Sequence, residues 1–243
     1  MSPSDVAIAL IRPGLLGTYG DRGNATVLGE RLRRRGISAR VLDLDRGPVP
    51  SDADLYLLGG GEDGAQSGVA GDEQLRGALN AAVERGAVVL GVCAGFQLLG
   101  RTFETGTGEV VAGFDILDCR SARRSGPRAV GEVLAEPRAD LGLPTLTGFE
   151  NHGGGTWLGT ELAPLGRLEV GVGNGDGSGT EGAISGRVVG TYMHGPVLVR
   201  NPALADLLLT WAVGESLDPL PMPEVDRLRA ERLAAARRNA TRS

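Results

Sequence analysis

Short apolar runs alternate with helix-forming segments through the first half of the chain, and this alternation restricts the fold more than any other feature. The predicted strands are Val6 to Ile11, Ser38 to Leu44, Asp54 to Leu58 and Ala87 to Val92, and the predicted helices run from a cap at Asn24 to about Arg35, from Asp72 to Glu84 and from Ala94 to Gly100. Strands that alternate with crossover helices form mostly parallel sheets with helices on both faces. We therefore expect an α/β fold built on such a sheet.

The second half of the chain has a different pattern. Its segments are short strands between glycines and prolines from Asp115 to about Val172, a glycine-rich loop from Gly171 to Gly182, a strand from Val188 to Met193, a helix from Pro202 to Val213 and a charged helix from about Glu224 to Arg238. The sequence contains neither an internal repeat nor a convincing domain boundary. We predict a single domain over residues 1–243.

Composition excludes several classes of function. The 243 residues carry a formal net charge of -5, which argues against a nucleic-acid groove. All 25 basic residues are arginine, so the chain has no lysine for a phosphate-binding loop or a Schiff base. No apolar run is long enough to span a membrane, and the N-terminus lacks the pattern of a secretion signal. We expect a cytoplasmic protein that leaves any ATP chemistry to another chain.

The segment from Ala87 to Gly100 predicts a nucleophile. An apolar strand leads to Cys93, which has a glycine two positions before it and another two positions after it, and a helix follows. This pattern is typical of the sharp turn that lifts a nucleophilic side chain out at the carboxyl end of a sheet. The amino end of the helix favours the thiolate, and its first amide, Ala94, could donate to an oxyanion. The other cysteine, Cys119, has no such setting and is predicted to be structural.

The chain contains only two histidines, so the base that would serve Cys93 is nearly a two-way choice. His194 follows an apolar strand, and open α/β sheets place their ligands just past the carboxyl ends of such strands. His152 lies in a loop among glycines. The spacing favours His194 as the base, with His152 as the alternative or as a hydrogen-bonded support around the site.

A second oxyanion donor is expected from a loop beside Cys93, because one amide rarely suffices. The run Gly59 to Gly61 follows an apolar strand and exposes backbone N–H groups that no side chain covers. We predict that Gly60 and Gly61 form the oxyanion hole together with Ala94. The alternative is that these glycines only turn the chain from a strand into a helix.

Five segments together resemble the class I (triad-type) glutamine amidotransferases, and more narrowly the cobyric-acid-synthase type. They are Gly91 to Gln97, Thr18 to Asn24, Gly59 to Asp63, Gly148 to Gly153 and Gly190 to Pro196. The matches occur in the family's order and extend over most of the chain. Within this type the chain looks most like the glutaminase subunits of lipid II isoglutaminyl synthases. The resemblance implies a flavodoxin-like sheet flanked by helices.

The resemblance also implies an activity and a partner. Cys93 would attack the side-chain amide of L-glutamine, His194 would deliver the proton to departing ammonia, Gln97 would support the site, and Arg128 would bind the substrate. Judged by its own surroundings in the sequence, Arg128 could equally be a solvated arginine. The implied partner is a MurT-like Mur ligase subunit that carries ATP and Mg and amidates the D-glutamate of the lipid II stem peptide in a heterodimer. Neither a cofactor nor a metal is expected in this chain.

One position departs from the family's pattern. Many class I enzymes have a glutamate two positions after the histidine, where this chain has Pro196. Either a carboxylate from another segment orients the imidazole, or the site works as a Cys–His dyad. Three other interpretations stay open: a glutaminase for another acceptor such as a corrin carboxylate, a binding scaffold without catalysis, and a cysteine peptidase on the same turn.

Overall fold

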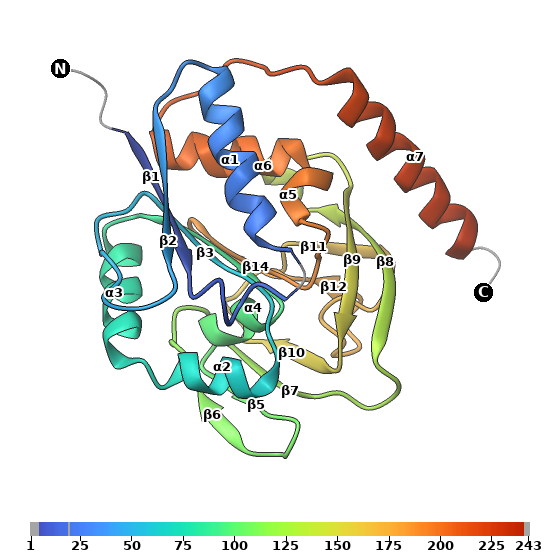
Figure 1. The fold of residues 1–243 in the computed structure, drawn as a ribbon. Helices are drawn as coiled ribbons and strands as arrows, with labels where there is room; N and C mark the ends of the chain where they lie inside the picture. Colours follow the sequence, from blue (N-terminus) through green and yellow to red (C-terminus); the bar gives the residue numbers. More distant parts are fainter. Residues whose placement is uncertain (1–4, 19, 241–243) are drawn as a thin grey trace.

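A six-stranded sheet forms the centre of the computed structural model, which describes residues 5–18 and 20–240 (Figure 1). The strands are β1 (Val6–Ile11), β2 (Ala39–Leu44), β3 (Leu55–Leu58), β4 (Val88–Val92), β13 (Ala183–Ser185) and β14 (Val188–Thr191), in the order β13-β14-β4-β3-β1-β2. Every pairing is parallel except that of β13 with β14. The predicted mostly parallel sheet is confirmed, and the order β2-β1-β3-β4-β14 is that of flavodoxin-like folds.

Crossover helices cover both faces of this sheet. Helix α1 (Arg22–Arg34) connects β1 to β2 toward one edge, whereas α3 (Glu73–Glu84) lies in the connection from β3 to β4 toward the other edge. Because such crossovers are right-handed, helices that run toward opposite edges lie on opposite faces. Helix α6 (Pro202–Val213) packs beside α1 (Figure 1). The strands β1, β3 and β4 are buried along their whole length, as expected for strands between two helical layers.

Three short helices begin beyond the carboxyl ends of the central strands. They are α2 (Asp63–Ala70) after β3, α4 (Ala94–Leu99) after β4 and α5 (Val197–Arg200) after β14. Because the strands are parallel, these helix starts and the loop after β1 all meet at one edge of the sheet. Open α/β sheets bind their ligands at this edge.

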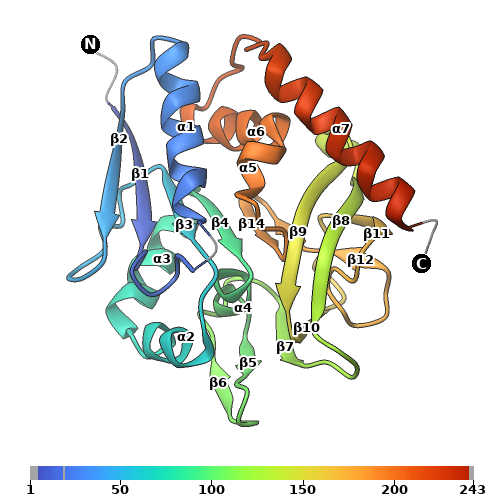
Figure 2. The same cartoon turned by 45° about the vertical axis from the view of Figure 1, so that its right-hand side comes forward.

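The remaining strands form two four-stranded sheets. They are β5 (Thr102–Glu104), β6 (Val110–Ala112), β7 (Cys119–Arg123), β8 (Ala129–Pro137), β9 (Leu146–His152), β10 (Gly154–Leu158), β11 (Gly166–Val170) and β12 (Thr180–Glu181), with a 3-10 helix at Ala139–Leu141. Their orders are β10-β7-β5-β6 and β12-β11-β8-β9. Helix α7 (Pro223–Ala240) crosses the second of these sheets (Figure 2), where Arg237 pairs with Glu169 at 2.6 Å. The predicted short strands and charged terminal helix are confirmed.

Two local expectations differ from the structure. Asn24 does not cap α1, which begins two residues earlier, because its buried side chain accepts a hydrogen bond from the Leu198 amide at 3.0 Å and so joins α1 to α5. Helix α2 was not predicted, since it contains two glycines and lacks the apolar spacing of a surface helix. Its place directly after the glycine run at 59–61 shows that these glycines lead into a helix.

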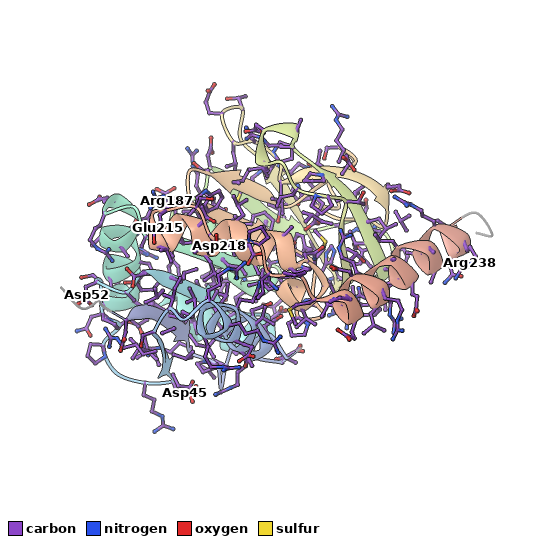
Figure 3. The ribbon with its side chains drawn as sticks, turned by 90° about the horizontal axis from the view of Figure 1, so that it is seen from above. Asp45, Asp52, Arg187, Glu215, Asp218 and Arg238 are labelled. Atoms are coloured by element: carbon purple, nitrogen blue, oxygen red, sulfur yellow. The ribbon has the colours of Figure 1, made fainter. Side chains whose placement is uncertain are left out.

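Most charged side chains lie on the surface, but three buried carboxylates lie around the site. Asp45 and Asp52 are exposed at the rim of the molecule, as Figure 3 shows from above. In contrast, Asp21, Glu150 and Glu181 are almost completely buried. Carboxylates are rarely buried without a partner or a function. Among the helices of the described residues, none is long and apolar enough to cross a membrane.

Candidate active site

Cys93 occupies a strained turn between β4 and α4. Its backbone angles are φ 53° and ψ -106°, a combination that is rare for a residue with a side chain. The backbone amide of Cys93 donates to the Thr191 carbonyl of β14 at 2.8 Å, which holds the turn against the neighbouring strand. The residue is 8% exposed. The predicted sharp turn between strand and helix at Cys93 is therefore present in the structure.

The two glycines around Cys93 allow a close packing of the backbone. A Cβ atom on Gly91 would lie 2.8 Å from the Gly95 carbonyl carbon, and one on Gly95 would lie 2.3 Å from the Leu58 carbonyl oxygen. Cβ atoms do not approach other atoms so closely in folded proteins, so any larger residue would push α4 away from β3 or β4. The flanking glycines are thus required by sterics at this turn.

His194 is the histidine that contacts Cys93. It lies just beyond β14, is 2% exposed, and its Nδ1 atom is 3.4 Å from Asp21 Oδ2. Burial by itself lowers the pKa of His194, but hydrogen bonds and charge interactions with Asp21 and Cys93 outweigh it and raise the pKa to about 9. The imidazole is therefore protonated at neutral pH. This geometry supports the choice of His194 over His152.

Asp21 supplies the carboxylate that the position of Pro196 lacks. It lies at the end of the loop between β1 and α1, and its Oδ2 atom also accepts the Gly60 amide at 2.8 Å. A Cβ on Gly59 would lie 2.9 Å from the Asp21 Cβ, so a glycine is needed there to seat the loop. The family resemblance of the segment Thr18 to Asn24 did not by itself indicate a role for Asp21. The only available signal was an acidic residue in a loop that follows a buried strand.

Pro196 has a packing role in place of the missing glutamate. Its Cγ atom would lie 2.4 Å from a Cβ on Gly23, so the turn after His194 rests directly on the first turn of α1. This contact brings the residues beside Asp21 and those beside His194 together. The proline therefore fits an arrangement in which the orienting carboxylate comes from the α1 side.

His152 lies in the wall of the cavity that Cys93 also lines, and its partners differ from those of His194. Its ring stacks on Tyr192 with 4.0 Å between the ring centroids, Nδ1 is 2.8 Å from the Gly154 carbonyl, and Nε2 is 3.5 Å from Glu150 Oε2. Glu150 in turn accepts the amides of Val172 and Gly173, both at 2.8 Å. These contacts fix His152 as a rigid part of the wall, in agreement with its predicted supporting place.

Gln97 belongs to a chain of hydrogen bonds behind the nucleophile. It accepts from Gln66 at 2.9 Å and donates to the Tyr192 hydroxyl at 3.0 Å. The Tyr192 hydroxyl is also 2.7 Å from Thr156 Oγ1. A buried polar chain of this kind holds its members in one arrangement when each group has a partner. Its location fits the supporting place expected for Gln97.

A cavity of about 270 Å³ opens above Cys93. Its lining residues include Gly61, Glu62, Cys93, Ala94, Gln97, Glu104, Arg123, Arg128, Asn151 and His152. Arg128 Nε donates to Asn151 Oδ1 at 2.6 Å, and Nη2 donates to the Asn151 carbonyl at 3.0 Å, so the guanidinium is held at the rim of the cavity. Arg123 shares this cavity, whereas Arg120 lies over the Trp157 ring. The structure thus brings Arg128 and Cys93 to one cavity.

The three predicted oxyanion donors differ in their surroundings. Ala94 and Gly61 line the cavity, and Ala94 is the first residue of α4, where backbone amides have no acceptor within the helix. The Gly60 amide instead donates to Asp21. Because this amide already donates to the carboxylate beside His194, the prediction that Gly60 donates to the oxyanion is wrong. The oxyanion prediction stays with Gly61 and Ala94.

Cys119 lies neither at a strained turn nor in the lining of the cavity, in contrast to Cys93. It is buried on β7, and burial raises the pKa of its thiol to about 12. A thiol in such a place is inert. Among the described residues, no group of three or more histidine, cysteine, aspartate and glutamate side chains could hold a metal ion.

The order of the sheet and the strained turn at its carboxyl edge define a class I glutamine amidotransferase-like fold. Residues 7–202 match the family of CobB/CobQ-like glutamine amidotransferase domains. The chain therefore belongs to this family of glutamine-hydrolysing enzymes.

Two curated relatives have nearly the same extent as this chain. The GatD subunit of lipid II isoglutaminyl synthase (glutamine-hydrolyzing) from Staphylococcus aureus strain N315 is 32% identical over 214 residues, which cover 87% of this chain and 86% of that protein. The same subunit from Streptococcus pneumoniae strain R6 is also 32% identical over 214 residues, which cover 87% of this chain and 82% of that protein. The resemblance to this type of subunit is confirmed.

Other relatives share a part of their length or the fold alone. Cobyric acid synthase from Saccharopolyspora erythraea is 35% identical over 68% of this chain, but the match covers only 30% of that protein. A crystal structure of a glutamine amidotransferase superposes with a TM-score of 0.56 at 22% identity, covering 85% of this chain and 98% of that chain. At this level of identity the likeness concerns the fold.

The pKa of His194 predicts how glutamine hydrolysis depends on pH. The imidazolium persists at neutral pH and loses its proton as the pH rises through about 9, so activity should decline there. Asp21→Asn removes one of the groups that raise this pKa, so the decline should begin at a lower pH and kcat should fall by about 10–100-fold, as for other orienting partners. Rates of ammonia release between pH 6 and pH 10, measured for both proteins, check this. An identical pH profile in Asp21→Asn would contradict the proposed effect of Asp21 on His194.

Proposed function

We propose that the chain is the glutaminase subunit of a two-subunit amidating ligase, with Cys93 as nucleophile. The observation that carries this proposal is a strained cysteine that lines a small cavity and interacts with a buried histidine–aspartate pair. The protonated state of His194 favours a thiolate on its neighbour Cys93, and the amino end of α4 adds to this preference. A thiolate needs no further activation to attack an amide carbon.

The reaction follows from these positions. The Cys93 sulfur attacks the side-chain carbonyl carbon of glutamine, and the negative charge that develops on the oxygen is stabilised by the amides of Ala94 and Gly61. His194 gives its proton to the departing nitrogen, which leaves as ammonia when the carbon–nitrogen bond breaks. The product is a γ-glutamyl thioester. Neutral His194 then takes a proton from water, and the resulting hydroxide releases glutamate and restores the thiolate and the imidazolium.

Arg128 is proposed to hold the α-carboxylate of glutamine. Its guanidinium is already oriented by two hydrogen bonds to Asn151, so little side-chain freedom would be lost on binding. A guanidinium fork can bind a carboxylate through two parallel hydrogen bonds. The cavity, at about 270 Å³, is of a size for one amino acid.

The acceptor and the partner are inferred from the relatives. The chain covers 86% of the S. aureus GatD subunit, so the two proteins correspond over nearly their whole length. We infer a heterodimer with a MurT-type ligase in the cytoplasm, where the ligase binds ATP and Mg and amidates the D-glutamate α-carboxylate of the lipid II stem peptide. A corrin carboxylate is the second candidate acceptor, because cobyric acid synthases match over about two thirds of this chain.

Replacement of the nucleophile should abolish ammonia release. Cys93→Ala removes the sulfur that forms the thioester, whereas Cys119→Ala changes only a buried structural thiol and should keep most of the activity. Ammonia and glutamate are measured after incubation with glutamine, and circular dichroism verifies that both variants fold. Ammonia release by Cys93→Ala at the wild-type rate would contradict the assignment.

Substitution of Arg128 should weaken the binding of glutamine more than it slows turnover. Arg128→Ala removes a charge-assisted pair of hydrogen bonds, so KM should rise by about 10-fold or more, given about 1.5–3 kcal/mol for such bonds. Arg128→Lys should recover only a part, since it lacks the fork. Arg120→Ala is the control, because Arg120 stacks on Trp157 outside the cavity. An unchanged KM in both Arg128 variants would contradict the role of Arg128 and make Arg123, which lines the same cavity, the candidate for binding the carboxylate.

Reconstitution with a candidate ligase tests the proposed partner. With ATP and lipid II, free ammonia should support amidation by the ligase alone, whereas glutamine should support it only when this chain with intact Cys93 is added. Amidated lipid II is measured by mass spectrometry. Amidation of a corrin substrate in place of lipid II would select the other acceptor, and glutamine-driven amidation with Cys93→Ala would contradict the proposal.

A further inference from the structure

The chain segment that carries His194 leaves the central sheet before it reaches the histidine. Strand β14 ends at Thr191, so the next residues, Tyr192 and Met193, have no ladder of strand hydrogen bonds. Their amides are nevertheless satisfied by side chains. The Tyr192 amide donates to Glu181 Oε1 at 2.9 Å, and the Met193 amide donates to Thr191 Oγ1 at 3.0 Å.

Thr191 connects this segment to the nucleophile. Its carbonyl accepts the Cys93 amide at 2.8 Å, while its hydroxyl donates to Glu181 Oε1 and accepts from Met193. One residue therefore holds the turn of Cys93 through its backbone and the approach to His194 through its side chain. Thr191 is completely buried, so water cannot replace either contact.

Glu181 is an unusual residue to find at this place. It is completely buried, and its Oε2 atom has no hydrogen-bond partner among the described residues. Burial raises its pKa, although its hydrogen bonds with Thr191 and Tyr192 and the charge of His152 act in the opposite direction. An apolar residue of similar volume would avoid this desolvation cost and would normally be neutral or more stable. The two hydrogen bonds that Glu181 accepts at the end of β14 offset a part of this cost.

We propose that Glu181 and Thr191 are positioning residues that set the distance between Cys93 and His194. The oxygen Oε1 of Glu181 accepts from both the hydroxyl and the backbone beyond Thr191, so it fixes the rotamer of the threonine and the path of the chain toward the histidine. The other backbone support of His194 is a pair of hydrogen bonds with Phe149 of β9, at 2.8 and 3.0 Å. This inference rests on the proposed role of Cys93 and His194 in glutamine hydrolysis.

Paired substitutions separate positioning from bulk stability. Thr191→Val removes the hydroxyl and keeps the shape, whereas Thr191→Ser restores the hydroxyl. Glu181→Leu removes the acceptor, whereas Glu181→Gln keeps an oxygen that can accept both hydrogen bonds. Kinetics on the full chain with its ligase partner should show kcat lowered by about 10–100-fold in Thr191→Val and Glu181→Leu, as for outer partners that orient reactive groups. KM should hardly change, and Thr191→Ser and Glu181→Gln should retain most of the activity.

A second readout does not depend on glutaminase activity. The rate of alkylation of Cys93 by iodoacetamide, followed by peptide mass spectrometry from pH 5 to pH 10, reports how well His194 supports the thiolate, and Cys119 is the internal reference. In wild type the reaction should stay fast toward low pH, and in Thr191→Val and Glu181→Leu the profile should move toward that of an ordinary cysteine. If wild type shows no glutaminase activity with or without its ligase, the proposed function fails while this measurement still decides the positioning role.

Leu79→Ala is the control for general destabilisation. Leu79 is completely buried on α3, which contributes no residue to the cavity. This variant should lower the melting temperature without a change in kcat or in the alkylation profile. The positioning role is overturned if Thr191→Val and Glu181→Leu behave like Leu79→Ala, or if Glu181→Gln loses as much activity as Glu181→Leu.

Discussion

The hydrogen bond from the Cys93 amide to the Thr191 carbonyl is the contact on which the site depends. It joins the ends of β4 and β14, two strands that are adjacent in the sheet although about two fifths of the chain lies between them. Parallel pairing of these strands brings their carboxyl ends to the same edge, so the nucleophile and the histidine arrive together. The later half of the fold, with its two smaller sheets, forms the walls around this pair.

Close packing of the backbone makes that contact possible. Glycines at 91 and 95 let α4 start almost in contact with β3, and the glycine at 59 lets the loop after β1 reach the same place. The cost is a cysteine in a backbone conformation that side chains rarely adopt. Extensive burial of the central strands offsets this cost, since β1, β3 and β4 contribute apolar residues along their whole length.

The electrostatics of the site depend on buried carboxylates from three different segments. Asp21 acts on His194 directly, Glu150 lies beside His152, and Glu181 holds the end of β14. All three lie in a region from which water is excluded, where a charge or a hydrogen bond has a larger effect than on the surface. The replacement of the family's glutamate by Pro196 is therefore compatible with an oriented histidine, because Asp21 reaches it from the α1 side.

The sequence by itself determined the central sheet, the turn at Cys93 and the class of chemistry. These features depend on local patterns: apolar runs of strand length, glycines at fixed offsets from a cysteine, and a helix that begins directly after it. Only the tertiary structure decided which residues surround the cysteine. Asp21, Glu181 and the contact of His194 with Cys93 arise from segments that are distant in the sequence, and their roles are set by which strand ends lie side by side. The engagement of the Gly60 amide by Asp21 could not be foreseen for the same reason, since a local pattern does not show where a distant carboxylate will lie.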